Sequence, residues 1–413
     1  MCALQECGVL TPFKLPGGLG LSQPGAVCEL NSVNQGRTHR VWTDWPVAGR
    51  HLSRTDRRSP VPVTSRRPVG AMVPPPTVTM SCDPLPVIDL RQAAGPGRAR
   101  LASRLVAALE TDGFFYVEGI DGYDEHELMS YTRWFFNLPD DVKMGIARKK
   151  FNEKTNFLYR GYFPVDKTDS SHKEGYDLAS LEPLSDPEKV KGNIFYEPTP
   201  WPETSDTEGL RKFQEFSVRF YGLMTAAGMT LLELAAEGCG APSDKLVNLF
   251  RPDPVSTLRY LHYPPRQGDI PASARDPTDD AVLLCAAHHD SGFVTMVSTF
   301  EYEGLELQRA DGSWMPVPCR SGAVVVNIGD MLSTISGGKW KATNHRVIDH
   351  GVNRFSVPFF LEPRYTANMS VRLPCSGQAE PAEVSYGPWA ITKMINNFYE
   401  FKDIPYPKSL VAE

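Results

Sequence analysis

The stretch Ala286-Ala287-His288-His289-Asp290-Ser291-Gly292 places a histidine and an aspartate two residues apart. Side chains alternate between the two faces of an extended strand, so His288 and Asp290 point the same way and His289 points the opposite way. An imidazole and a carboxylate two residues apart can therefore bind one metal ion from a single strand. Because His-x-Asp also arises often by chance, a metal site needs support from other residues.

A third ligand must come from elsewhere in the chain, and His345 in Asn344-His345-Arg346 is the best candidate. Two histidines and one carboxylate on one side of an ion, with the other positions open, form the facial triad of non-haem Fe(II) oxygenases. A lone histidine is more often structural than a ligand. Strand alternation directs the next residue, Arg346, away from the metal.

An element suited to binding an anion follows soon after His345, in Arg354-Phe355-Ser356. The period of two places the arginine and the serine on one face of a strand. The planar guanidinium offers a fork of donors to a carboxylate, and the hydroxyl adds a further one. Metal ligands followed by an anion clamp in this order are much less expected by chance than either element alone.

These residues lie in a segment, residues 256–363, that resembles the C-terminal domain of the Fe(II)/2-oxoglutarate-dependent dioxygenases, in the isopenicillin N synthase-like subgroup. The pieces that carry this resemblance are Leu258–Pro265, Ala286–Val297, Val326–Leu332, Lys341–Val347 and Arg354–Ser356. The N-terminal half is similar to the same subgroup in Pro86–Leu90, Asp112–Val117, Phe136–Pro139, Arg160–Tyr162 and Lys173–Asp177.

The resemblance implies a double-stranded β-helix, or jelly roll, with the metal at its open mouth. It implies Fe(II), 2-oxoglutarate as cosubstrate and O2, and it leaves a requirement for ascorbate open. The expected reaction couples oxidative decarboxylation of 2-oxoglutarate to hydroxylation or a related oxidation of a small organic molecule. The implied site residues are His288, Asp290 and His345 for catalysis and the metal, and Arg354, Ser356 and Tyr263 for the far carboxylate of 2-oxoglutarate.

The sequence departs from the subgroup pattern at two positions, and three other functions compete with the oxygenase. His289 stands where the family usually has threonine, and could be a further contact or an alternative ligand; the asparagine usual near Glu118 is missing. The first alternative function is a 2-oxoglutarate-independent iron oxidase of the same fold, like isopenicillin N synthase or aminocyclopropane-carboxylate oxidase. A silent binding module has no need of the ligands and the arginine, and a nucleic-acid demethylase would need a basic face.

Composition gives the outer bounds on fold and partners. The chain has 413 residues, a net charge of −6 and eight cysteines, none in a Cys-x-x-Cys pair. We therefore expect a globular enzyme with reduced thiols, cytoplasmic, and neither a zinc site nor a disulfide framework. No apolar run reaches about eighteen residues, so no membrane partner is expected. No nucleic-acid partner is expected either, whereas oligomeric state is undetermined.

The first eighty residues differ from the rest. They carry nine Lys/Arg and four Asp/Glu, a local charge of +5 that leaves −11 for the remainder, and they are rich in Gly, Pro, Ser and Arg. Such a composition predicts a disordered N-terminal extension. An arginine-rich leader is typical of organelle targeting, but an untargeted extension, or a start at Met72 or Met80, is at least as consistent with the sequence.

Periodicity then predicts a mainly β fold with flanking helices around the jelly-roll core. Expected helices cover residues 97–111, 123–136, 208–238 and 388–401, the last with Trp389, Ile391, Met394 and Phe398 buried. Expected strands cover residues 87–90, 114–117, 255–263, 281–285, 294–300, 304–308, 323–328, 344–347 and 355–361, with a hairpin turn at Asp311-Gly312. Residues 150–205 are expected to be rich in loops. Four residues in them could form the wall of a substrate pocket, although each is individually more often structural: Arg160, Tyr162, Tyr176 and Trp201. The expected divisions are 1–80 (extension), 84–205 (N-terminal dioxygenase region), 206–252 (helical linker), 253–365 (dioxygenase jelly roll) and 366–413 (C-terminal helical segment).

Overall fold

The computed structural model describes residues 85–166, 171–180, 182–188, 190–380 and 383–397. Backbone contacts separate residues 1–80 from residues 81–413 as two units. The extension that the composition predicts to be disordered lies outside the described residues. Among the helices of the described ranges, none is long and apolar enough to cross a membrane.

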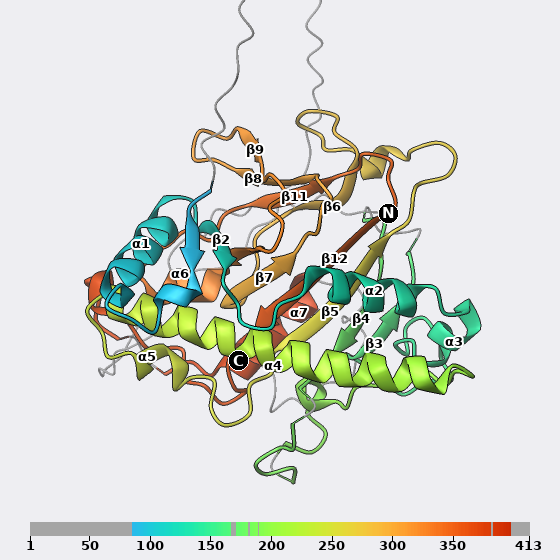
Figure 1. Cartoon of the computed structure of the whole chain (residues 1–413), viewed down its shortest axis with the longest axis horizontal. Helices are drawn as coiled ribbons and strands as arrows, with labels where there is room; N and C mark the ends of the chain where they lie inside the picture. The colour runs from blue at the N-terminus through green and yellow to red at the C-terminus, as the bar shows by residue number, and fades with distance from the viewer. Residues whose placement is uncertain (1–84, 167–170, 181, 189, 381–382, 398–413) are drawn as a thin grey trace, which may run out of the picture. The chain divides into compact units, whose positions relative to one another are not determined.

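Two sheets build the described part of the chain (Figure 1). The large sheet has the strand order β1-β2-β10-β7-β12-β5-β4-β3, and the small sheet has the order β6-β11-β8-β9. The strands of the large sheet are β1 (Val87–Asp89), β2 (Phe114–Glu118), β3 (Gly161–Phe163), β4 (Glu174–Leu178), β5 (Thr257–Tyr263), β7 (Val294–Ser298), β10 (Val324–Ile328) and β12 (Arg354–Leu361). Those of the small sheet are β6 (Leu283–His288), β8 (Leu305–Gln308), β9 (Trp314–Pro316) and β11 (His345–Ile348). All pairings except that of β1 with β2 are antiparallel, as a jelly roll requires.

Each face of the large sheet packs into a different hydrophobic cluster, as β10 illustrates. Val324 and Val326 belong to the cluster beneath the helices, whereas Val325 belongs to a second cluster between the sheets. This second cluster also contains Leu284 from β6 and Leu307 from β8, so the two sheets face each other across it. The period of two therefore decides which strand residues reach the interior of the barrel.

The outer face of the large sheet is covered by the long helix α4 (Thr207–Gly238), visible in green in Figure 1, and by α1 (Arg98–Thr111). Helix α4 begins where Asp206 accepts a hydrogen bond from the Gly209 N–H, and its buried face includes Phe213 and Phe220. Gly228 brings this helix close to the sheet, because a Cβ there would lie 2.6 Å from Leu361 Cδ2. Both helices match the predicted ones within two residues.

The remaining helices are short or terminal. They are α2 (Glu125–Phe136), α3 (Asp140–Gly145), α5 (Asp244–Val247), α6 (Asp330–Ile335) and α7 (Tyr386–Asn397). Helix α7 matches the described part of the predicted tail helix, with Ile391 and Met394 buried and Trp389 half-buried, whereas Phe398 lies outside the described residues. The predicted hairpin is confirmed: β8 pairs with β9 across a turn in which Gly312 has a φ of +85°.

Residues 150–205 are rich in loops, as predicted, but two short strands that were not predicted also lie there. Strands β3 and β4 lie there and extend the large sheet beyond β5. Tyr176 on β4 is fully buried against Phe135, and Arg160 is fully buried and donates to Thr257 Oγ1 and to the Phe195 carbonyl. Both residues therefore serve the packing of the fold.

Candidate metal centre

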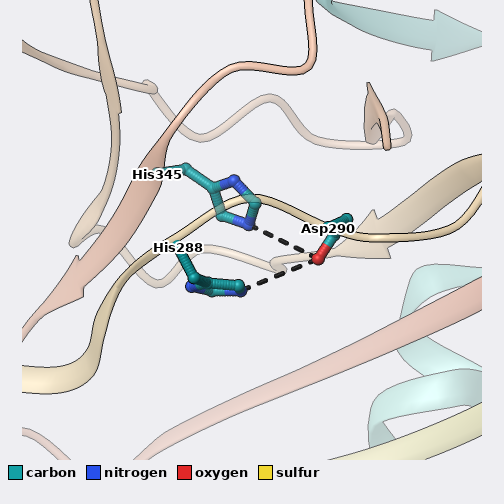
Figure 2. Close-up of side chains that lie close together, drawn as sticks. All are labelled: His288, Asp290 and His345. Carbon is teal, nitrogen blue, oxygen red and sulfur yellow. Dashed lines mark ion pairs between the residues drawn. The ribbon is translucent and has the colours of Figure 1, made fainter. Parts of the chain in front are cut away.

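The three residues predicted to bind a metal come together at one end of the small sheet. Strand β6 ends at His288 and β11 begins at His345, and these two histidines are directly paired across the strands. Asp290 lies just past the end of β6, in the turn that leads to β7. The chain is no longer a strand at Asp290, but its carboxylate still faces the same side as His288 (Figure 2).

The side-chain donor atoms converge on a common point. His288 Nε2 lies 3.7 Å from Asp290 Oδ1, and His345 Nε2 lies 3.9 Å from the same oxygen (Figure 2). One ligand atom from each residue lies within 4.8 Å of the other two. His345 is buried, Asp290 is half-buried and His288 is exposed, so the centre opens on the side of His288.

Hydrogen bonds fix which nitrogen of each histidine faces the centre. His288 Nδ1 lies 2.8 Å from the Ala286 carbonyl oxygen, and His345 Nδ1 lies 3.1 Å from the Thr343 carbonyl oxygen. A carbonyl can only accept, so each Nδ1 must carry the proton and donate it. Nε2 is then the nitrogen left for a metal, and its lone pair is available in the neutral ring, which is the arrangement that metal-binding histidines usually have.

The carboxylate of Asp290 is oriented in the same manner. Its Oδ2 accepts a 2.6 Å hydrogen bond from Thr295 Oγ1 and a 2.7 Å hydrogen bond from Asn327 Nδ2. Oδ1 is the oxygen that faces the two histidines. The sequence motifs indicate neither Thr295 nor Asn327 as part of the site. The alternation along β10 could have indicated that Asn327 faces the barrel interior, but not that it reaches Asp290.

The electrostatics of the centre suit a cation. Burial would raise the pKa of Asp290, but the two histidines and its hydrogen bonds hold it below the ordinary value. Burial, together with the charge of His288, lowers the pKa of His345 to about 4. Burial would also lower the pKa of His288, but Cys285 and Asp290 raise it to about 9, so a metal must displace a proton from that ring.

The two residues next to the ligands play no part in this cluster. The side chain of His289 is exposed and is not one of the three residues whose donor atoms converge. Arg346 points to the other face of β11, as predicted, where it bonds Asp276, Asp279 and Glu306. The structure thus gives no support to His289 as an alternative ligand.

The three residues predicted to bind the far carboxylate lie together on the large sheet. Arg354 on β12 is directly opposite Tyr263 on β5, and its guanidinium carbon lies 4.9 Å from the centre of the Tyr263 ring. Ser356, two residues along β12, faces the same side. All three side chains are buried. The register of β5 with β12 therefore gathers an arginine, a phenol and a hydroxyl in one place.

Arg354 has the hydrogen-bonding capacity that an anionic ligand needs. Its Nε donates to the Glu303 carbonyl oxygen at 3.3 Å, whereas its buried Nη1 has no partner among the described residues. A buried guanidinium nitrogen without a partner is costly, and a carboxylate would satisfy it. The donors of the centre and this unpartnered nitrogen thus fit a divalent transition metal and a dicarboxylate cosubstrate.

Two protein-family models match the chain. The model of the 2OG-Fe(II) oxygenase superfamily matches residues 252–363. The model described as non-haem dioxygenase in morphine synthesis N-terminal matches residues 85–204. The first match includes the metal cluster and the arginine element, and the second includes β1 to β4.

Curated relatives and solved structures agree with these matches. A 2-oxoglutarate-dependent dioxygenase of Monascus ruber is 30% identical over 72% of this chain and 89% of its own length. One of Didymella fabae is 30% identical over 70% of this chain and 88% of its own length. A full-length Neurospora crassa enzyme, solved with α-ketoglutarate and 5-formyluracil, has a TM-score of 0.63 at 21% identity, covering 76% of this chain and 96% of that one. A Caulobacter crescentus protein of the 2OG-Fe(II) oxygenase family has a TM-score of 0.61 at 24% identity, covering 76% and 98%. The likeness to both structures confirms the jelly-roll fold.

Proposed function

Because the chain belongs to the 2OG-Fe(II) oxygenase superfamily, we propose that His288, Asp290 and His345 are the ligands of its ferrous ion. The chain is an Fe(II)- and 2-oxoglutarate-dependent oxygenase that uses O2 and oxidises small molecules. The 2-oxoglutarate-independent oxidase is not favoured, since the relatives named above are 2-oxoglutarate-dependent dioxygenases. The observation that carries the ligand assignment is the convergence of two Nε2 atoms and one carboxylate oxygen.

The ligand geometry supports an open, catalytic centre. Three protein ligands on one side would leave the other coordination positions of a ferrous ion open, as in the facial triad of non-haem Fe(II) oxygenases. A ferrous ion held there supplies the activation of O2 that oxidative decarboxylation requires. The side chains of Thr295 and Asn327 keep Asp290 Oδ1 turned toward the histidines, so that the carboxylate presents one oxygen to the ion.

The far carboxylate of 2-oxoglutarate would bind at Arg354. Its unpartnered Nη1 offers a charge-assisted hydrogen bond in a buried environment, and Ser356 and the Tyr263 phenol supply further donors. The apolar side chains between the sheets exclude water from the cosubstrate. One molecule each of 2-oxoglutarate, O2 and substrate would give succinate, carbon dioxide and a hydroxylated or otherwise oxidised product.

We further propose an isopenicillin N synthase-like, cytoplasmic enzyme whose substrate is not a nucleic acid. The subgroup is supported by the N-terminal resemblance in Asp112–Val117 and Lys173–Asp177. The location is supported by the four cysteines of the described ranges, Cys239, Cys285, Cys319 and Cys375, which are all free thiols. The net charge of −11 on residues 81–413 opposes binding to a polyanion. We also propose the division into an extension (1–80), an N-terminal dioxygenase region (84–205), a helical linker (206–252), a jelly roll (253–365) and a C-terminal helical segment (366–413).

Uncoupled turnover tests this function without knowledge of the substrate. The purified protein, supplied with Fe(II), 2-oxoglutarate and O2, should release succinate slowly, and a substrate should accelerate that release. His345→Ala should abolish the release, whereas the neighbouring His289→Ala should retain it. The ligand assignment would be wrong if His345→Ala released succinate at the rate of the unaltered protein.

A further inference from the structure

The turn that follows Asp290 is held from one side by the start of α6. The Asp330 N–H donates to the Asp290 carbonyl oxygen at 2.8 Å, and the Gly329 N–H donates to the Phe293 carbonyl oxygen at 3.0 Å. The Met331 N–H reaches the Gly292 carbonyl oxygen at 3.2 Å. These bonds fix the backbone of the turn, which carries one of the three proposed ligands.

A buried carboxyl group holds the same turn from the other side. Glu362 follows directly after β12, and a Cβ on Gly292 would lie only 1.8 Å from Glu362 Oε1. The Glu362 carboxyl therefore packs against the α-carbon of Gly292, and it accepts a hydrogen bond from the Phe293 backbone. Ser256 Oγ fixes the Glu362 backbone, because it accepts from the Glu362 N–H and donates to the Glu362 carbonyl oxygen.

The second oxygen of Glu362 connects the turn to the C-terminal helix. Tyr386, the first residue of α7, donates from its hydroxyl to Glu362 Oε2 at 2.5 Å, and its side chain is 4% exposed. The Tyr386 N–H also bonds the Ala367 carbonyl oxygen at 2.9 Å. A continuous chain of contacts thus runs from α7 through Tyr386 and Glu362 to the residues beside Asp290.

Among the described residues this carboxyl has no cationic partner, which makes its burial costly. The titratable groups that face it are Tyr386 on α7 and Asp290 in the turn. Burial, reinforced by the charge of Asp290, raises the pKa of Glu362 to about 8, so the group is neutral at pH 7. An apolar side chain would avoid the desolvation cost but could not bond to Phe293 and Tyr386 at once.

We propose that Glu362 is a positioning residue for the metal centre, which fixes the turn after Asp290 and fastens α7 to that turn through Tyr386. The proposal rests on the proposed function, because Asp290 matters here as a metal ligand. It makes the affinity for Fe(II) depend on α7, although none of the three proposed ligands lies on that helix. Neither Glu362 nor Tyr386 belongs to the catalytic cluster itself.

Four variants of the full chain test this role. Tyr386→Phe removes one hydrogen bond, and Glu362→Ala removes the whole contact. Glu362→Gln retains the shape: its amide oxygen can accept from the Phe293 backbone, and its NH2 group can donate to the Tyr386 hydroxyl oxygen. The matched control is Tyr176→Phe, since Tyr176 is also fully buried and donates from its hydroxyl to the Pro200 carbonyl oxygen at 2.6 Å. The readouts are the Kd for Fe(II), from anaerobic titration, and amide hydrogen exchange in the turn and in α7.

We expect Tyr386→Phe to weaken Fe(II) binding about threefold to tenfold, and Glu362→Ala to weaken it more. Loss of a residue that hydrogen-bonds a metal ligand typically lowers metal affinity by about 10–100-fold, and Glu362 acts on Asp290 one contact further away. Exchange should accelerate in both the turn and α7. Glu362→Gln should restore the affinity and the protection, and Tyr176→Phe should leave both unchanged.

The proposal is overturned if Glu362→Ala and Tyr386→Phe fold and bind Fe(II) as tightly as the unaltered protein. It is also overturned if Tyr176→Phe weakens Fe(II) binding to the same extent, because the effect would then be a general loss of stability. If the unaltered protein binds no Fe(II), the proposed function fails first. In that case the exchange data decide: faster exchange of the turn and α7 in both variants supports the link, and unchanged exchange refutes it.

Discussion

At the scale of single residues, each proposed ligand is oriented by a group on its far side. The Ala286 and Thr343 carbonyls receive the Nδ1 protons of His288 and His345. Thr295 and Asn327 occupy Oδ2 of Asp290. The three donor atoms are thus held ready before a metal arrives, and little ordering remains to be done on binding.

The hydrogen bonds to Asp290 should therefore be visible in metal affinity. We expect Thr295→Val and Asn327→Leu each to weaken Fe(II) binding by about 10–100-fold, since each removes one of the two hydrogen bonds that stop the carboxylate from rotating. Thr132→Val is the control, because Thr132 is equally buried and bonds only the Leu128 carbonyl in α2. Anaerobic titration measures the affinity, and unchanged Kd values in both variants would show that these bonds do not position the ligand.

The unpartnered nitrogen of Arg354 leads to a prediction about stability. Arg354→Met should leave the melting temperature of the ligand-free protein unchanged or higher, because a buried cation lacking one hydrogen bond is replaced by an apolar side chain. The same variant should weaken the binding of 2-oxoglutarate by roughly 100-fold, the cost of losing one side of a buried charge pair. Thermal shift with and without 2-oxoglutarate measures both effects. A variant that 2-oxoglutarate still stabilises fully would argue against binding at Arg354.

At the scale of elements, β11 serves the metal centre with one face and the fold with the other. His345 faces the barrel interior, and the next residue, Arg346, is buried on the opposite face. Its guanidinium bonds Asp276, Asp279 and Glu306 and lies 4.1 Å from the centre of the Trp314 ring. This cluster ties the loop before β6 to β8, and so fixes the strand that carries His345.

Removing that guanidinium should destabilise the protein strongly. Arg346→Met leaves three carboxylates near one another without their shared cation, and we expect the free energy of unfolding to fall by about 3–5 kcal/mol. Arg211→Ala, which breaks only exposed pairs on the surface of α4, should have no measurable effect. Urea unfolding of the two variants measures the difference. Equal stability of both would mean that the acidic cluster contributes nothing to holding β11.

Local patterns predicted most elements, because α4, β5 and β12 show clear helical or alternating periodicity. They missed β3 and β4. Strand β3 pairs with β4, and β4 pairs in turn with β5, some eighty residues further along the chain. The same limit applied to the site. Spacing alone suggested His288 and Asp290, but the contacts of Thr295, Asn327 and Glu362 with the turn depend on strand register and on packing between distant segments. No pattern within one stretch of sequence encodes these.

At the scale of the whole molecule, the metal centre lies at the end of the small sheet, while α7 and β12 reach the turn after Asp290 through Glu362. Stability and metal binding are therefore linked through one buried acid. Its ordinary pKa of 4.5 rises to about 8 in the folded protein. The folded state binds the proton more tightly than the unfolded chain does.

This shift predicts a pH dependence of stability. The contribution of the neutral acid is fully present below about pH 4.5 and is lost as the pH rises through about 8. In metal-free protein with chelator, the unaltered chain should therefore lose stability relative to Glu362→Gln across that window. Urea unfolding of both proteins at several pH values gives the difference and cancels the other titrating groups. A difference that does not change with pH would show that Glu362 titrates normally.

Anaerobic titration of the purified protein with Fe(II) and 2-oxoglutarate tests whether the three-residue cluster binds Fe(II) and whether Arg354 anchors 2-oxoglutarate beside it. We expect the weak visible charge-transfer band of the Fe(II)–2-oxoglutarate chelate, with one ion bound per chain. The band should vanish in His345→Ala, weaken in Arg354→Ala and persist in His289→Ala. Iron bound without any band would contradict the cosubstrate assignment, and a protein that binds no iron would contradict the metal centre itself.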